Sequence, residues 1–216
     1  MRKNEVDIIR QIRFGNVNEK ELIDIYDNQR DNYRIRFHLI QHPKFPIKVA
    51  LNSIQQLFTM DLIRLIKNRR SNPFIRKKAE TEFLTRFQRL AMGEKIAILK
   101  TAPVQVLNHF IEESDLRILK IIFKNPECNE ELILKFINRK SQRSEFYQAL
   151  QLSDWYKRPA IVDAIIRDNE APIKLILDMI PLLKNEQLKK LYHNKNTHEI
   201  VKTNIMDHFG KKSPGN

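Results

Sequence analysis

The chain has 216 residues, with 39 Lys and Arg against 26 Asp and Glu and a formal net charge of +13. A single Cys excludes an internal disulfide and leaves a Cys-based zinc cluster short of ligands, and only four Gly argue against a fold rich in tight hairpin turns. The 42% apolar content excludes a disordered chain and allows a sizeable core.

The sequence predicts a cytoplasmic protein. The first residues, Met1 to Asp7, contain no apolar stretch of the kind that a secretory signal needs. The longest apolar runs are a few residues, as in Ile121–Phe123, whereas a membrane span needs about 20. The lone Cys128 fits a reducing compartment. We therefore expect a soluble protein with no transmembrane segment.

The chain is predicted to be all-α. Apolar residues recur at spacings of three and four almost everywhere, which is the helical period, and we find no strand alternation. Breakers divide this pattern into about fifteen short helices with tight connections. In chain order, the expected helices cover residues 4–13, 18–28, 31–41, 46–57, 60–67, 73–89, 93–101, 103–112, 115–124, 129–138, 144–151, 155–167, 172–181, 185–193 and 197–209.

Several helix starts carry local signals. Asn18 precedes Glu21 by three residues, which is the spacing of a capping box. Asn129 precedes two acids that suit the first turn of a helix. Four prolines fit the first helical position, where the missing N–H does no harm. These prolines are Pro46, Pro73, Pro103 and Pro172.

An internal repeat links two parts of the chain. Residues 46–83 and 172–209 align without gaps at an offset of 126, with ten identities that are mostly apolar and at helical spacing. The offset is three times 42 residues, a typical length for a helix-pair repeat. An intermediate copy begins near Asn125 and lines up with His42 and Asp168. Because one helix pair cannot bury its apolar stripe alone, neighbouring pairs must share a core.

Two further stretches carry a resemblance to known helical-repeat proteins. They are LTRFQRLAMGEKIA at residues 84–97 and NPECNEEL at residues 125–132. Together with the repeat, they make the chain resemble HEAT-like and armadillo-like α-solenoids, including a bacterial group of the leucine-rich repeat variant type. The resemblance implies an α-α superhelix of about four to five helix pairs, with a curved binding surface and no shared catalytic residues. The expected parts are capping helices in residues 1–30, a repeat array in 31–209 and a flexible tail in 210–216.

The positive charge is concentrated in one third of the chain. Residues 1–34 hold seven basic and seven acidic groups, residues 35–101 hold fourteen and four, and residues 102–216 hold eighteen and fifteen. The densest part of the middle segment supplies the candidate partner-binding residues. They are Arg64, Lys67, Arg69, Arg70, Arg76, Lys77, Lys78, Arg86 and Arg89.

This basic cluster allows three interpretations. A basic stripe attracts nucleic acid or another polyanion by releasing counterions. It also attracts an acidic protein face or an anionic membrane. The third interpretation is a solvated surface that keeps the protein soluble. We expect no aromatic residue to interleave with the basic cluster, as a single-strand binder requires, and this favours the solvated surface.

No motif predicts catalysis or a cofactor. The four Gly lie far apart, which excludes a phosphate-binding loop and a dinucleotide fingerprint. His38 and His42 have a metal-compatible spacing, but His42 precedes Pro43 at a helix end and no nearby acid is an obvious third ligand. Cys128 lies among acids that oppose a reactive thiolate, so we expect a structural residue at a helix start. We predict no metal site and no catalytic residue.

One enzymatic alternative is a HEAT-like alkylpurine DNA glycosylase, because such enzymes use a basic concave face with Trp residues and one Asp. Here Trp155 follows Asp154 and precedes Lys157 and Arg158. Those enzymes rely on more than one Trp, so Trp155 is instead expected to anchor a helix in the core. The sequence favours a non-enzymatic binding or scaffold protein for a protein partner, with nucleic-acid binding through residues 64–89 as the alternative.

Overall fold

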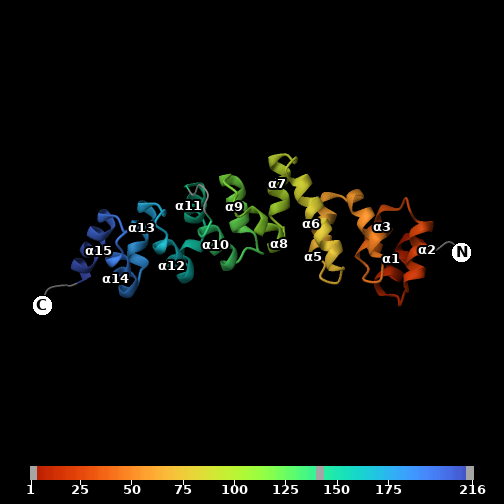
Figure 1. The fold of residues 1–216 in the computed structure, drawn as a ribbon, viewed down its shortest axis with the longest axis horizontal. Coiled ribbons are helices and arrows are strands. Elements are labelled where there is room, and N and C mark those ends of the chain that lie inside the picture. The colour runs from red at the N-terminus through yellow and green to blue at the C-terminus, as the bar shows by residue number, and fades with distance from the viewer. Residues whose placement is uncertain (1–3, 140–143, 213–216) are drawn as a thin grey trace. The chain divides into compact units, whose positions relative to one another are not determined.

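The chain is all-α, as the apolar periodicity predicts. The computed structural model describes residues 4–139 and 144–212, and within these ranges it contains fifteen α-helices and four short 3-10 helices, with no strand (Figure 1). None of the helices in these ranges is long and apolar enough to cross a membrane.

The chain divides into two compact units, residues 1–94 and 95–216. The first unit holds α1 Glu5–Phe14, α2 Glu19–Asn28, α3 Tyr33–Gln41, α4 Ile47–Ser53, α5 Thr59–Lys67 and α6 Pro73–Phe87. The boundary falls within α7 Met92–Leu99. The second unit holds α8 Val104–Leu107, α9 Leu116–Lys124, α10 Glu130–Ile137, α11 Ser144–Gln151, α12 Pro159–Arg167, α13 Ile173–Met179, α14 Asn185–His193 and α15 Glu199–Lys212.

Short 3-10 segments account for most differences from the expected helix limits. They are η1 Ile54–Gln56 after α4, η2 Asn108–Phe110 after α8, η3 Trp155–Lys157 before α12 and η4 Ile180–Leu182 after α13. The expected helix 155–167 is thus interrupted at Arg158, because Pro159 opens a new helix and lacks the N–H to continue the old one. The predicted tail from residue 210 begins inside α15, and its last residues, 213–216, lie outside the described part of the chain.

The predicted caps at Asn18 and Asn129 are confirmed. Asn18 Oδ1 accepts from Glu21 N at 3.0 Å while Glu21 Oε2 accepts from Asn18 N at 2.8 Å, which completes a capping box. Asn129 Oδ1 accepts from Leu132 N at 2.9 Å. Of the four prolines, Pro73 is the first residue of its helix as predicted. The prediction is wrong by one position for the other three, which occupy the N-cap with extended ψ: Pro46, Pro103 and Pro172.

The 126-residue offset is repeated in the helices themselves. Helices α3, α4 and α5, together with η1, reappear at this offset as α12, α13, α14 and η4 with the same lengths. From the start of α3 to the start of α5 there are 26 residues, and the same interval separates the starts of α12 and α14. Successive helix pairs in these copies therefore begin at a shorter interval than the 42 residues expected. Hereafter the first copy is residues 33–67 and the second copy is residues 159–193.

One turn geometry joins the paired helices at five places. The residue that ends the first helix turns its side chain back to accept from the backbone N–H two residues later, as Asn68 does from Arg70 N at 3.0 Å. A buried or half-buried residue follows at the third position, as Cys128 does after Asn125. The five turn residues are His42, Asn68, Asn125, Asp168 and Asn194.

Each unit has its own apolar core. In the first unit Leu39, Leu62 and Phe83 are fully buried. In the second unit three rings pack together, with Phe136 stacked on Phe146 at 5.8 Å between centroids and Phe123 edge-on to Phe136 at 5.5 Å. These cores leave the polar faces of the helices and the turns exposed, and most of the candidate binding residues lie there, whereas Arg76 and Arg86 are half-buried.

Candidate functional site

The predicted basic cluster lies on α5, on α6 and on the turn between them, except Arg89, which lies in the turn that follows α6; all of it is within the first unit. Because α5 and α6 bury their apolar stripes against each other, their exposed stripes face away from the shared interface. Arg64 and Lys67 lie on the exposed stripe of α5, and Lys77 and Lys78 lie on that of α6. The cluster therefore does not form one continuous helix face.

Some of its members are already paired within the protein. Arg64 binds Asp61 at 2.7 Å, and Lys77 binds Glu80 at 3.4 Å. Arg76 is half-buried, and its Nε has no hydrogen-bond partner within the described ranges.

Arg86 is a structural residue of the first unit. Its guanidinium donates to Glu82 Oε1 at 2.7 Å, to the carbonyl of Leu57 at 2.5 Å and to the carbonyl of Gln55 at 2.7 Å. Only 26% of its side chain is exposed. These bonds tie α6 to the end of η1, so the guanidinium has few donors left for a partner.

The remaining cations are exposed and have no acidic partner among the residues that the structure describes. They are Lys67, Arg69, Arg70, Lys78 and Arg89. Burial, and then the charges of Lys44 and Arg70, lower the pKa of His42 in the neighbouring turn. We call Lys67, Arg69, Arg70, Lys78 and Arg89 the basic hairpin.

The expectation that no aromatic residue interleaves with the basic cluster is wrong. Phe74 follows Arg70 and precedes Arg76 in the sequence, and its ring is 72% exposed in the first turn of α6. An exposed ring among cations is the combination that single-stranded nucleic acids use for stacking and charge. The solvated-surface interpretation loses the argument on which it depended.

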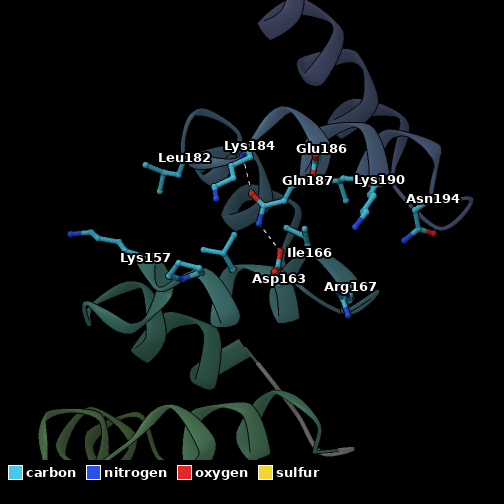
Figure 2. Close-up of a pocket in the computed structure, with 13 residues that line it drawn as sticks. Lys157, Asp163, Ile166, Arg167, Leu182, Lys184, Glu186, Gln187, Lys190 and Asn194 are labelled. Carbon is cyan, nitrogen blue, oxygen red and sulfur yellow. Dashed lines mark hydrogen bonds between the residues drawn. The ribbon is translucent and has the colours of Figure 1, made fainter.

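A second surface lies in the other unit, between α12 and α14, and we call it the α12–α14 groove (Figure 2). It has a volume of about 360 Å³. Its apolar floor includes Val162, Ile166 and Leu191, which are buried, and Leu182 at one end is exposed. Four cations and two acids surround this floor: Lys157, Arg167, Lys184 and Lys190 against Asp163 and Glu186.

Hydrogen bonds hold the polar groups at the centre of the groove. Gln187 on α14 points down toward Asp163 on α12, and its amide donates to Asp163 Oδ1 at 2.5 Å (Figure 2). The Gln187 carbonyl oxygen accepts from Lys184 N at 2.8 Å. With these central groups satisfied inside the protein, the side chains left to meet a ligand are apolar residues, four cations and, at the edge, Glu186 and Asn194.

The positions that the two copies share give no sign of this groove. The useful signal is where they differ: Tyr33 and Phe58 of the first copy become Pro159 and Lys184 at the offset of 126. Loss of two aromatic rings between otherwise matching helices is the pattern that would have pointed to an open groove.

Cys128 and Trp155, which the sequence raises as candidates for a nucleophile and for a base-binding ring, have structural roles. Burial, rather than the neighbouring acids, raises the pKa of the Cys128 thiol to about 12, so the thiolate needed for reactivity is suppressed. Trp155 is partly buried, donates its indole N–H to the carbonyl of Phe123 at 2.8 Å, and is covered by the Arg158 guanidinium at 4.4 Å from its centroid. This ring is engaged within the protein, but it is not buried in the core as the sequence predicts.

His38 and His42, whose spacing is compatible with a metal, do not belong to a larger group of metal ligands among the described residues. His42 Nδ1 accepts from Lys44 N at 3.2 Å, and the pKa of His38 is lowered by burial and by the charges of Arg13 and Arg34. In residues 4–139 and 144–212 no three His, Cys, Asp or Glu side chains come together as a metal-binding group.

Comparisons with protein-family models, with curated proteins and with solved structures find no match to this chain. The likeness to HEAT-like and armadillo-like solenoids therefore stays a prediction from the sequence. The function has to be argued from the two surfaces themselves.

Proposed function

We propose that this chain is a non-enzymatic binding protein, a solenoid of stacked helix pairs that holds a segment of a protein partner. The observation that carries the proposal is the α12–α14 groove, with its apolar floor and its excess of cations. A groove between two helices, apolar inside and polar at the edge, is the usual site for a peptide segment.

The groove is suited to binding more than to bond-breaking. Its one central carboxylate, Asp163, is occupied by the Gln187 amide, and the hydrogen bond from Lys184 N fixes that amide in place. A general base needs a carboxylate that reaches the substrate, and a nucleophile needs a base beside it. The described lining offers a surface of fixed shape and charge instead.

The test is capture of partners by the full-length tagged chain from extracts of the cells that make it. The variant Lys184→Glu with Lys190→Glu reverses two charges at the groove, and Lys189→Glu with Lys195→Glu reverses two exposed charges outside its lining. We expect a protein partner that the control retains and the groove variant loses. Retention by both variants, or a nucleic acid as the captured species, would contradict the proposal.

A second candidate function is binding of nucleic acid by the basic hairpin. Five cations without an acidic partner in the described ranges favour it, four of them on α5, on α6 and on the turn between them, together with the exposed ring of Phe74. Each phosphate that a cation neutralises releases a counterion, so binding falls steeply as salt rises. The exposed ring adds a platform on which a base stacks.

A salt titration tests this second candidate. Labelled single-stranded and duplex oligonucleotides are titrated with the full chain at several NaCl concentrations. We expect the variant Lys67→Gln with Arg70→Gln to lower the slope of log affinity against log salt by about two. The matched control is Lys189→Gln with Lys195→Gln. Absence of binding at low salt would end this candidate, whatever the result of the partner capture.

A further inference from the structure

The two copies differ in the side chains that lie between their first and third helices. In the first copy, the rings of Tyr33 and Phe58 contact each other at 4.5 Å between centroids, on the side of α3 and α5 that corresponds to the groove. In the second copy, Pro159 and Lys184 occupy the equivalent positions, and both line the α12–α14 groove. The groove is thus the place where the first copy carries its own aromatic pair.

The hydrogen bonds show the same exchange. In the first copy the backbone N–H of Phe58 donates to the Tyr33 hydroxyl at 2.9 Å, and that hydroxyl donates to Asp61 at 2.5 Å. In the second copy the N–H of Lys184 donates to Gln187, which stands at the position of Asp61. Gln187 satisfies the N–H that Pro159 cannot reach, and it does so without filling the space.

We propose that the α12–α14 groove binds an acidic segment of a partner protein that inserts one aromatic side chain. This inference rests on the proposed function and names the chemistry of its partner. The inserted ring takes the place that Tyr33 and Phe58 take in the first copy, against the buried side chains of Val162 and Ile166. Burial of an aromatic ring is a typical anchor of such an interface.

The charge around the groove selects acidic flanking residues. Lys184, Lys190 and Arg167 have no ion pair within the described chain, whereas Lys157 is paired with the exposed Asp154 at 3.2 Å. Two of these cations, Lys184 at the N-cap of α14 and Lys190 on α14, lie near the central Gln187 (Figure 2). Carboxylates that flank the inserted ring would meet these ammonium groups at the exposed edge, where they guide orientation.

The lining disfavours a nucleic acid as the occupant. It contains no aromatic side chain on which a base could stack, and Asp163 and Glu186 repel phosphates along its length. A peptide has a neutral backbone, and its side-chain carboxylates can turn toward the cations at the edge and away from these acids. The groove and the basic hairpin therefore suit different ligands.

The probe is a fluorescein-labelled peptide, Glu-Asp-Glu-Phe-Asp-Glu-Asp, titrated with the full chain by fluorescence anisotropy at moderate salt. Two matched peptides replace the Phe by Ala or all acids by Gln and Asn. We expect each change to weaken binding by about tenfold or more. Equal affinity for the Phe and Ala peptides would overturn the proposal, and so would tighter binding of the uncharged peptide.

Two variants locate the binding. Lys184→Glu with Lys190→Glu should weaken the acidic peptide by about tenfold or more, while Lys189→Glu with Lys195→Glu should have little effect. Pro159→Tyr with Lys184→Phe restores the aromatic pair and should abolish binding by filling the groove. Circular dichroism checks that each variant is folded. If Pro159→Tyr with Lys184→Phe does not fold, the result of the charge-reversal variant decides whether the peptide binds in the groove. An oligothymidine of equal charge that competes at the groove would overturn the peptide assignment.

The peptide titration and the partner capture together distinguish failure of the acidic aromatic segment from failure of the proposed binding function. If the peptides do not bind but a protein partner is lost with the groove variant, the acidic aromatic segment is wrong and the binding function stands. If no captured protein depends on the groove, the binding function itself fails.

Discussion

At the scale of single residues, Tyr33 shows how one hydroxyl organises a helix pair. It accepts from the backbone of Phe58 and donates to Asp61, so it satisfies an N–H and a carboxylate at once. Burial and the hydrogen bond to Asp61 raise its pKa from 10.0 to about 12. The folded state therefore holds the phenol proton more tightly than the unfolded state does.

This shift predicts a pH-dependent cost for Tyr33→Phe. Below about pH 10 the variant should lose about 1 kcal/mol of unfolding free energy with the two hydrogen bonds. As pH rises from 10 to about 12, the unfolded wild type ionises first, so the wild type loses this stability and the gap narrows. Urea denaturation at several pH values measures the difference in unfolding free energy between the wild type and Tyr33→Phe, with Tyr192→Phe as control. The raised pKa of Cys128 affects both proteins and cancels. A gap that widens with pH would contradict the prediction.

Asn125 is the most constrained of the five turn residues. It is buried, its amide donates to the carbonyls of Leu99 at 2.6 Å and Ala102 at 3.0 Å, and its oxygen accepts from Glu127 N at 2.6 Å. Asn125→Ala leaves these backbone groups without this partner, so we expect a loss of about 2–3 kcal/mol in denaturant unfolding. The exposed neighbour of another turn, Asn169→Ala, should change stability by less than about 0.5 kcal/mol. Equal effects would refute the structural role.

At the scale of helices, a comparison of Arg86 with Arg89 distinguishes a cation that holds the fold together from one that is exposed and available to a partner. Arg86→Met keeps the apolar stem but removes the two bonds that tie α6 to Gln55 and Leu57 and the bond to Glu82 within α6. We expect a loss of about 2 kcal/mol in unfolding free energy. Arg89→Met should be near neutral, because Arg89 is exposed and has no acidic partner in the described ranges. Thermal and denaturant unfolding of both variants make the comparison, and equal losses would show that Arg86 is not a structural tie.

At the scale of the whole molecule, the charge of +13 predicts a response to salt. Like charges in residues 35–101 repel one another more in the compact state, and salt screens this repulsion. We expect the midpoint of thermal unfolding to rise by a few degrees between about 10 and 200 mM NaCl. Changing Lys67, Arg69, Arg70 and Lys78 together to Gln should flatten the rise. A midpoint that falls with added salt would mean that ion pairs dominate.

Much of the fold follows from the sequence because its causes are local. The capping box at Asn18 and Glu21, the cap at Asn129 and the three- and four-residue apolar spacing each act within one helical turn. The candidate site is less predictable. Arg86 and Arg89 look alike in the sequence, but their roles differ because only Arg86 reaches the carbonyls of η1, about thirty residues away along the chain.

The all-α class, the capped helix starts at Asn18 and Asn129 and the offset of 126 follow from the sequence, since periodicity, caps and matching residues are written in the order of the residues. Which cations lack an acidic partner, the exposure of Phe74, and the groove of the second copy at the place where the first copy carries the Tyr33–Phe58 pair all come from the tertiary structure. These properties depend on which side chains meet across helices. A side chain's partner is set by packing between distant segments, and neither composition nor spacing records it.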